Sequence, residues 1–207
     1  MADPIVVYNT GQGVAGAADP NYTISYSLTD PLPTAITPSA ATIVPNVYWI
    51  APTGGAQYIS NNALGGDAVV GPVSTSPGGF YTYTTTFNLS GFDFTTAELV
   101  GQFAADDVGT LYLNGVSRVN MVIGAGLPGA GFGHYTSFDL TGGFVDGTNT
   151  LQFVVKNGDG NTNTGGPTGL FVDVSGTVAP TPEPSSLLLL GTGIVGLGGA
   201  VRRRFKS

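Results

Sequence analysis

The chain of 207 residues contains no cysteine, one histidine and two glutamates, and each shortage excludes a class of chemistry. Without cysteine there is no disulfide bond, no thiol nucleophile and no thiolate metal site. His134 alone cannot supply a typical zinc site, and the G-x-S-x-G turn that carries the serine of many hydrolases is absent. Glu183 lies in the C-terminal tail, so Glu98 has no glutamate partner for paired-carboxylate hydrolysis of glycosides. This composition favours a protein that is not an enzyme.

Positive charge is also scarce before the last few residues. Residues 1–184 hold all 13 acidic side chains but only two basic ones, Arg118 and Lys156, which gives a net charge of −11; the remaining residues contribute +4. A surface of this sign repels nucleic acid and anionic membranes, so neither is expected as a binding partner. It is compatible with cation binding and with solubility outside the cell.

Helical periodicity is nearly absent before the tail, whereas turn-forming and aromatic residues are abundant. The chain has 33 Gly, 14 Pro and 20 Phe and Tyr residues, but only 9% of its residues are charged. This composition predicts an all-β domain that is large enough to fold without disulfides. Nine segments show the alternation or β-branching of strands: 22–28, 46–50, 80–89, 97–104, 110–113, 119–123, 135–140, 150–156 and 169–174.

Turn signals separate these segments, notably Asn114-Gly115, Asp146-Gly147 and Asn157-Gly158. Such pairs supply the positive φ angles that tight turns require. About nine strands at this spacing predict a β-sandwich or jelly roll over residues 1–177, and residues 178–184 are expected to form a proline-rich spacer.

The C-terminal residues have a three-part order: Pro182-Glu183-Pro184, then an uncharged run at 185–201, then a basic cluster at 202–207. A helix over the uncharged run would rise roughly 25 Å, slightly less than a hydrocarbon core of ~30 Å. Flanking arginines can reach the interface, and basic flanks stay cytoplasmic. We therefore expect a single transmembrane helix with the preceding domain outside the cell. A buried C-terminal core helix is the alternative, but it leaves the basic cluster unexplained.

This order resembles the PEP-CTERM tail of Gram-negative surface and biofilm-matrix proteins, which a membrane-embedded exosortase processes. The resemblance implies a cell-surface or matrix location, exosortase as processing partner and a transient stay in the inner membrane. It also implies a sorting element at Pro182, Glu183 and Pro184 and a basic stop at Arg202, Arg203 and Arg204.

Export requires a signal peptide, and none is evident in the chain. We therefore expect Ala2-Asp3-Pro4 to lie near the start of the mature protein, with Met1 added to it.

Other segments resemble galactose-binding-like jelly rolls. Asp106-Asp107 followed by Asn114-Gly115 is similar to a stretch that crosses the sandwich in those domains, residues 144–155 are similar to a returning strand pair, and residues 167–172 are similar to a final strand. The resemblance implies a jelly-roll fold, in which one of the two aspartates hydrogen-bonds the Asn-Gly turn. It does not imply a sugar ligand, because ligands differ widely within that superfamily.

Two places in the sequence could hold a cation such as Ca²⁺. One is a loop with side-chain oxygens at alternate positions, as in calcium loops: Asn157, Asp159, Asn161 and Asn163. Its alternative is a hairpin loop that satisfies its own backbone. The other place is Asp106 and Asp107, of which at most one should face a ligand, because adjacent residues of a strand point to opposite faces unless a bulge intervenes. A structural role and a sugar contact are the alternatives for this pair.

Trp49 could stack on a sugar ring, although its apolar neighbours Val47 and Ile50 favour a position in the core.

The leading hypothesis is a non-enzymatic protein of the envelope or biofilm matrix of a Gram-negative bacterium. One alternative is an exopolysaccharide-binding module that uses Trp49 and the Asp106-Asp107 region. The other is a homo-oligomeric matrix subunit, in which a strand at residues 5–8 adds to the sheet edge of a neighbouring copy.

Overall fold

A computed structural model describes residues 1–33, 37–44, 49–63, 76–121, 131–158 and 165–181. Apart from one short 3₁₀ helix, η1 (Gly131–Gly133), the regular elements of this part are strands, which confirms the predicted all-β class. They are β1 (Asp3–Pro4), β2 (Ala18–Ser27), β3 (Ser39–Ile43), β4 (Ile59–Ser60), β5 (Gly79–Asn88), β6 (Phe92–Asp106), β7 (Val108–Leu113), β8 (Val116–Asn120), β9 (Thr136–Leu140), β10 (Thr148–Asn157) and β11 (Gly169–Pro180).

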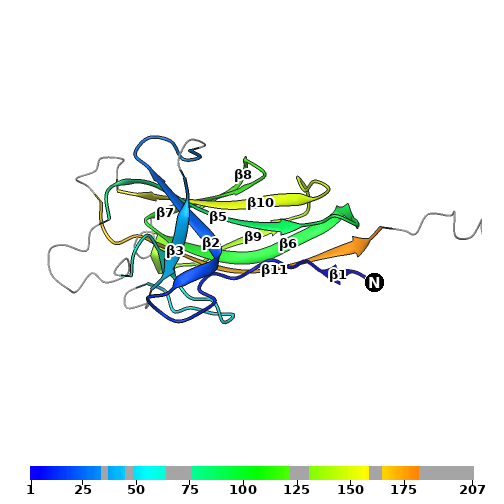
Figure 1. Cartoon of the computed structure of the whole chain (residues 1–207), viewed down its shortest axis with the longest axis horizontal. Coiled ribbons are helices and arrows are strands. Elements are labelled where there is room, and N and C mark those ends of the chain that lie inside the picture. The colour runs from blue at the N-terminus through cyan, green and yellow to red at the C-terminus, as the bar shows by residue number, and fades with distance from the viewer. Residues whose placement is uncertain (34–36, 45–48, 64–75, 122–130, 159–164, 182–207) are drawn as a thin grey trace, which may run out of the picture.

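The strands form one continuous antiparallel order that folds back on itself. The order is β8-β7-β10-β5-β2-β3-β4-β11-β6-β9, with β1 also paired to β11. One layer contains β8, β7, β10, β5 and β2, the other contains β4, β11, β6 and β9, and the short strand β3 joins the two at one side (Figure 1). This arrangement is a β-sandwich, as the strand spacing predicted.

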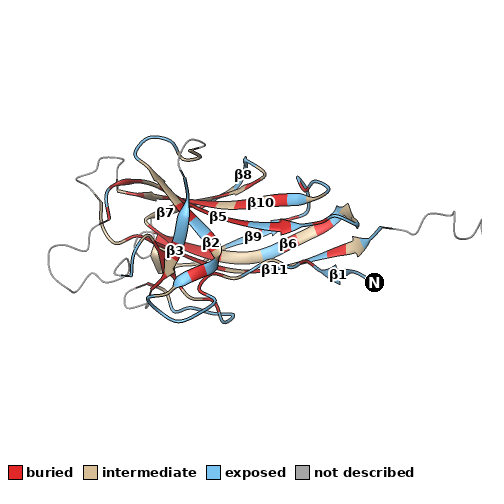
Figure 2. Ribbon diagram, in the orientation of Figure 1, coloured by how far each residue is buried: buried red, intermediate tan, exposed pale blue. Residues whose placement is uncertain are grey.

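Aromatic side chains from the two layers meet in the core. The ring centroid of Phe103 in β6 lies 5.4 Å from that of Phe153 in β10, and Phe138 in β9 lies 6.3 Å from Phe153. Buried residues alternate with more exposed ones along β7, whose burial follows the period of two expected for a strand with one face in the core (Figure 2). Burial of these rings is the main term that holds the layers together.

The chain passes from one layer to the other at Asp106 and Asp107. Strand β6 pairs with β11 and β9, whereas β7, which begins at Val108, pairs with β10 and β8. The stretch therefore crosses the sandwich, as its resemblance to jelly rolls implied. The hairpin that follows turns at Asn114 and Gly115, whose φ angles of 52° and 76° are those of a type I′ turn.

The N-terminal segment differs from the prediction. Residues 5–8 do not form a strand; only Asp3–Pro4 pair with β11, and the backbone N–H of Ile5 donates to the Gly176 carbonyl at 2.9 Å. Ile5 is buried in the core, whereas Val6 is 66% exposed. The β-branched run is therefore buried at one position but does not form a strand. The β11 N–H groups of Val174 and Val172 donate to the side chains of Asn9 and Thr10 and not to the carbonyls of a paired strand.

The C-terminal boundary also differs from the prediction. Strand β11 continues to Pro180, so the first three residues of the expected spacer at 178–184 belong to the sheet. Within the described residues, no helix has the length and apolar character needed to cross a membrane. The expected helix at 185–201 and the basic cluster at 202–207 lie outside the described residues.

The two ends of the sandwich can be told apart by the segments that lie there. Strand β11 begins opposite Asp106, where the chain crosses between layers, and ends opposite Phe92, where the C-terminal residues depart. We name these the crossing end and the tail end. The twelve residues of β11 separate them by roughly 35–40 Å, at ~3.3 Å per residue. The N-terminus lies at the tail end beside β1 (Figure 1).

Candidate functional site

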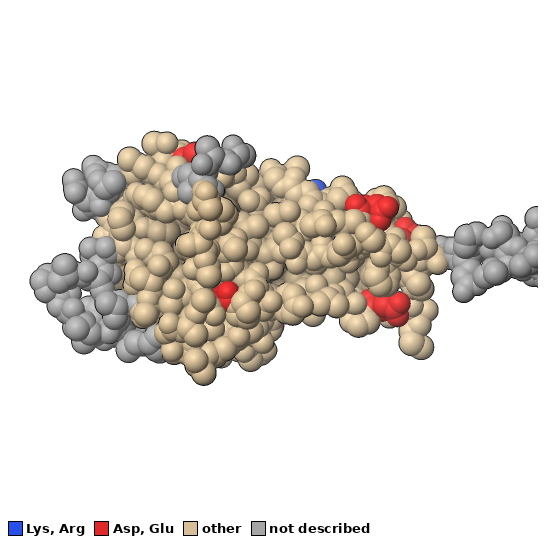
Figure 3. Space-filling model, in the orientation of Figure 1, with Lys and Arg blue, Asp and Glu red and all other residues tan. Residues whose placement is uncertain are grey.

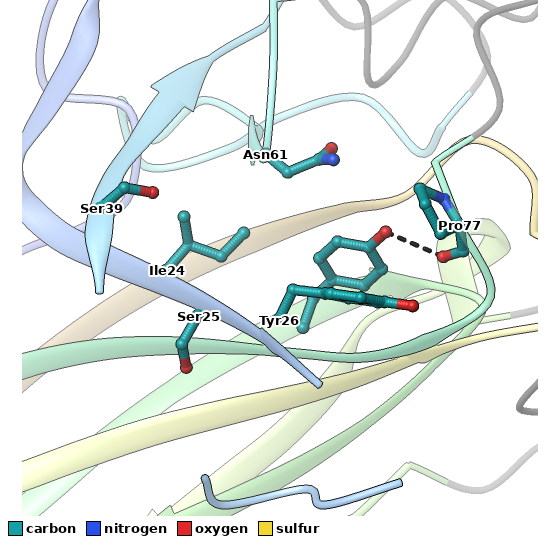
Figure 4. A pocket seen from close by; sticks show the side chains of 7 residues that line it. Ile24, Ser25, Tyr26, Ser39, Asn61 and Pro77 are labelled. Atoms are coloured by element: carbon teal, nitrogen blue, oxygen red, sulfur yellow. Dashed lines mark hydrogen bonds between the residues drawn. The ribbon is translucent and has the colours of Figure 1, made fainter. Parts of the chain in front are cut away.

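A groove of about 210 Å³ opens on β2 and β5 near the crossing end. Pairing of these strands places Tyr26 directly opposite Tyr81, and their ring centroids are 5.0 Å apart at an interplanar angle of 43°. The start of β3 and the segments beside β4 and β5 complete the walls. The lining residues are Ile24, Ser25, Tyr26, Ser39, Asn61, Pro77 and Tyr81 (Figure 4).

The two tyrosines give the groove an aromatic floor and wall. Tyr81 is buried and its hydroxyl donates to the Pro77 carbonyl at 2.8 Å, whereas Tyr26 is half-buried and donates to the Gly78 carbonyl at 2.9 Å. Burial, and secondarily Tyr26, raises the pKa of Tyr81 above its ordinary value. The Tyr81 hydroxyl therefore stays protonated and keeps its donor bond. Since both hydrogens are engaged, neither hydroxyl has a hydrogen left to donate to a ligand.

Asn61 supplies an oriented donor. Its Oδ1 accepts hydrogen bonds from Asn62 Nδ2 at 3.0 Å and from Ser76 Oγ at 2.9 Å. Two donors on one oxygen fix which way the amide faces, so that Nδ2 is left to donate. Figure 4 shows Ile24, Ser39 and Asn61 directed toward the same space, whereas Ser25 points away from it. None of the described residues that line the groove is charged.

A buried polar network holds this wall in place. Ser60 Oγ donates to the Thr168 carbonyl at 2.6 Å, and Asn157 Nδ2 lies 3.1 Å from the Ser76 carbonyl, 3.2 Å from that of Gly166 and 3.3 Å from that of Pro77. Asn157 Oδ1 in turn accepts from the Gly166 N–H. The wall of the groove is therefore fastened to the end of β10 and to the start of β11.

This network also bears on the calcium-loop hypothesis. Asn157 is fully buried, and both ends of its amide are occupied: Nδ2 donates to the Ser76 carbonyl and Oδ1 accepts from the Gly166 N–H. Asp159, Asn161 and Asn163 lie outside the described residues. Calcium binding by this loop therefore stays a prediction.

Asp106 and Asp107 fasten the crossing end. Asp106 Oδ2 accepts from Trp49 Nε1 at 2.8 Å, and Asp107 Oδ2 accepts from the Gly158 N–H of the Asn157-Gly158 turn at 2.8 Å. The two carboxyl groups also hydrogen-bond each other. Adjacent side chains meet here, contrary to the expectation of opposite faces, because β6 ends at Asp106 and β7 begins only at Val108.

The protonation state of Asp106 follows from this geometry. Burial and the hydrogen bond with Asp107 raise the pKa of Asp106 to about 8, against an opposing effect of the Trp49 donor. Asp106 therefore keeps its proton to a higher pH than an ordinary aspartic acid does. Within the described residues, no three His, Asp or Glu side chains are grouped so as to hold a metal ion. Calcium binding by Asp106 and Asp107 also stays a prediction.

Trp49 lies behind the crossing, outside the groove lining. Its side chain is 7% exposed, and its ring centroid lies 4.6 Å from that of Tyr58 in a small cluster that includes Ala104 and Phe171. A sugar contact by Trp49 stays a prediction, and the structure offers the face of Tyr26 in the groove as another stacking surface. Sequence reasoning missed this site, since no pattern within one chain indicates that Tyr26 and Tyr81 are paired.

Two further grooves, of about 250 and 170 Å³, adjoin on the outer face of β6 and β11 and share Val100 and Ser175. Their linings contain Glu98 and Asp173 but no aromatic side chain. On the face shown in Figure 3, acidic side chains gather mainly toward the tail end and hardly any basic one is visible. The groove of Tyr26 and Tyr81 is therefore the candidate that combines aromatic and uncharged polar groups.

Comparison with known families addresses the tail. Residues 180–204 match the family model of the PEP-CTERM protein-sorting motif. The chain carries a PEP-CTERM sorting motif. This motif is the recognition signal of exosortase processing, and the chain is accordingly an exported protein that is sorted to the cell envelope or beyond it. The match confirms the resemblance of the tail to a PEP-CTERM motif. The roles of Pro182, Glu183, Pro184, Arg202, Arg203 and Arg204 stay predictions, and these residues lie outside the described part of the chain.

No curated protein matches the chain, whereas solved structures show weak similarity. A β-glucosidase from Kluyveromyces marxianus in complex with glucose is 15% identical, with a TM-score of 0.40 over 83% of this chain and 17% of the other. An uncultured Clostridium β-glucuronidase is 14% identical, with a TM-score of 0.41 over 87% and 29%. A family 35 carbohydrate binding module from an environmental isolate is 12% identical, with a TM-score of 0.34 over 85% and 100%. The chain thus spans less than a third of either glycosidase, and the assignment of its fold rests on the strand pairing.

Proposed function

We propose that the chain is a non-catalytic, glycan-binding protein of the cell envelope or extracellular biofilm matrix, and that the groove of Tyr26 and Tyr81 binds exopolysaccharide. The observation that carries this proposal is the chemistry of the groove. A half-exposed aromatic ring lies beside an amide donor and a serine hydroxyl, and no side chain is charged among the lining residues that the structure describes. Sugar rings present apolar faces with a rim of hydroxyl groups, which suit an aromatic surface flanked by oriented polar groups.

Charge restricts the ligand further. The domain before the tail carries a net charge of −11, and the described lining of the groove includes no basic side chain that could offset the charge of a uronic acid or a sulfate. Repulsion of an acidic polymer would slow its approach and weaken its binding. The groove is therefore expected to take neutral sugar units.

The position of the groove agrees with display at a surface. Tyr81 lies near the start of β5, whereas the other end of β5, at Asn88, lies at the tail end, roughly 25 Å away at ~3.3 Å per residue. A domain attached through its tail would present this groove away from the membrane.

Tyr26→Ala is expected to weaken binding of purified exopolysaccharide to residues 1–181 about tenfold, since loss of an aromatic contact of ~1.4 kcal/mol corresponds to that factor. Tyr112→Ala is the matched control, because Tyr112 is also half-exposed but lies on β7 outside the groove lining. Binding is measured by calorimetry, with thermal melts to verify folding. Equal affinity of both variants and the parent would exclude the groove, and absence of binding by the parent to any glycan would refute the function.

Glu183→Ala is expected to leave export intact but to retain the protein at the inner membrane. The change removes the only charge of the Pro182-Glu183-Pro184 element within the matched sorting motif. Cell fractionation of a producing strain measures the result, with Glu98→Ala as a control that removes the other glutamate. Normal release of the Glu183 variant would contradict the role assigned to this element.

A further inference from the structure

The folded sheet and the sorting motif share a residue. Strand β11 ends at Pro180, and the motif match begins at Pro180. The next residue, Thr181, is still attached to the domain, because its backbone N–H and its hydroxyl both donate to the Gly91 carbonyl. The sequence predicted a spacer over residues 178–184, but the structure leaves no free spacer between the sandwich and Pro182.

The end of β11 is held more weakly than the rest of the strand. From Gly169 to Thr177 the strand pairs residue for residue with β6, and the register then shifts before Ala179. The Ala179 N–H donates to the Thr96 side chain at 2.9 Å instead of to a backbone carbonyl, and Pro180 has no N–H to donate. The Thr181 N–H lies 3.4 Å from the Gly91 oxygen, which is long for a hydrogen bond.

The core ends just before this weak section. Val178 is buried, Ala179 is half-buried, and Pro180 and Thr181 are exposed. Separation of residues 179–181 from residues 91–96 would therefore expose little apolar surface and leave the sandwich intact. Local opening of this kind is expected where backbone bonds are exposed and buried contacts are few.

A processing enzyme embedded in the membrane has to reach the motif beside a folded domain. An extended chain spans at most ~3.3–3.6 Å per residue, so Pro182-Glu183-Pro184 can supply only about 10 Å between the sandwich and the apolar run. Enzymes that cleave peptides commonly bind an extended segment, which is a form of strand addition. Release of residues 179–181 would double the length of extended chain, to about 20 Å.

We propose that residues 179–181 form a releasable strand end, which separates from residues 91–96 when the processing enzyme takes the sorting motif. The surface recognised by this partner is then the freed chain that follows Val178. This inference rests on the overlap of β11 with the motif and is independent of glycan binding.

A disulfide lock tests the proposal in the full chain, in a strain that produces the processing enzyme. Asp93 and Ala179 are directly opposite in the antiparallel pair, at a Cα separation that a disulfide can span, and the chain contains no other cysteine. Asp93→Cys with Ala179→Cys is expected to reduce the processed fraction of exported protein at least tenfold. Dithiothreitol, or either single substitution, should restore it.

The matched control places the disulfide in the part of β11 that precedes the weak section. Val100→Cys with Ser175→Cys joins another opposed and exposed pair of the same two strands, and this variant should be processed like the parent. Normal processing of the oxidised Asp93–Ala179 lock would overturn the proposal. Equal inhibition by both locks would also overturn it, because the effect would then not depend on the strand end.

A second variant acts in the opposite direction. Thr96→Val removes the oxygen that accepts the Ala179 N–H and should increase the initial rate of processing about twofold or more, without a change in the melting temperature of residues 1–181. An unchanged or lower rate would count against a separation step that limits processing.

Discussion

Asp106→Asn is expected to remove most of the pH dependence of the domain's stability between about pH 4 and pH 8. Burial, together with the hydrogen bond to Asp107, raises the pKa of Asp106 from its ordinary 3.8 to about 8 in the folded protein. The folded state therefore holds a proton that the unfolded state releases near pH 4. By linkage, the contribution of Asp106 to the free energy of unfolding is fully present below pH 4, falls as the pH rises to about 8, and then stays constant.

The asparagine variant isolates this proton. An asparagine is neutral at every pH, and its Oδ1 can still accept the Trp49 N–H that Asp106 accepts at 2.8 Å. Variant and parent should therefore have similar stability near pH 4. Above pH 8 the variant should be more stable by several kcal/mol, since each unit of pKa shift corresponds to about 1.4 kcal/mol.

Urea unfolding of residues 1–181 at a series of pH values measures the difference. Asp139→Asn is the matched control: Asp139 is exposed on β9, and its replacement removes the same formal charge without touching the crossing. The control should show the slope of the parent. If the free energy of unfolding varied with pH in the same way for the parent and for Asp106→Asn, Asp106 would be ionised in the folded protein. That result would favour a cation at Asp106 and Asp107.

The long strands could be predicted from the sequence because their burial follows their pattern. In β5 and β10 the aromatic and β-branched residues that alternate in the sequence are the ones that face the core, for example Tyr83 and Phe153. The Asn114-Gly115 turn was also predictable, since few residues other than Asn and Gly accept two successive positive φ angles.

The short strands were missed for the opposite reason. Strand β3 has only five residues, with Ser39 and Ala40 exposed, and β4 has only two. Neither is long enough for an alternation of apolar and polar residues to predict a strand. Both are nevertheless essential to the topology, because β3 and β4 join the two layers. Their positions depend on contacts with β2 and β11, which are distant in sequence.

None of the residues singled out from the sequence lines the groove. Asp106 and Asp107 were singled out as a pair, and the structure shows both at the crossing, with Asp107 bound to a turn at Gly158 instead of to the Asn114-Gly115 turn. The groove was not predicted: it is assembled from separate segments of the chain, and Asn61 becomes an oriented donor only because Asn62 and Ser76 converge on its oxygen. Contacts of this kind between separate side chains cannot be recognised in a single sequence.

Asp19→Ala is expected to lower the free energy of unfolding by about 3–5 kcal/mol, because buried donors without acceptors cost about 1–3 kcal/mol each. Asp19 is 2% exposed at the start of β2. One carboxylate oxygen accepts from the Gly11 N–H at 2.6 Å, and the other accepts from the N–H groups of Asn21 at 2.8 Å and Tyr22 at 3.1 Å. Alanine would leave three backbone donors without this acceptor.

The same carboxylate holds the N-terminal segment on the sandwich. Gly11 follows Asn9 and Thr10, whose side chains complete the edge of β11: Asn9 Oδ1 accepts from Val174 N–H at 2.7 Å, and Thr10 Oγ1 accepts from Val172 N–H at 2.9 Å. These side-chain bonds replace the strand that was predicted at residues 5–8. Loss of Asp19 should therefore loosen the first ten residues as well as β2, which hydrogen exchange would show as faster exchange at Ile5 and Thr10.

Asp30→Ala is the matched control for this prediction. Asp30 also precedes a proline and also caps the N–H two residues on, at 2.9 Å to Leu32, but it is exposed. Its replacement should cost well under about 1 kcal/mol, as expected for a surface position. Equal losses for the two variants in urea unfolding would contradict the role of Asp19 as a buried anchor. A large loss for Asp19→Ala alone would also constrain self-assembly through residues 5–8, since a neighbouring copy could accept that segment only after these intramolecular bonds had been broken.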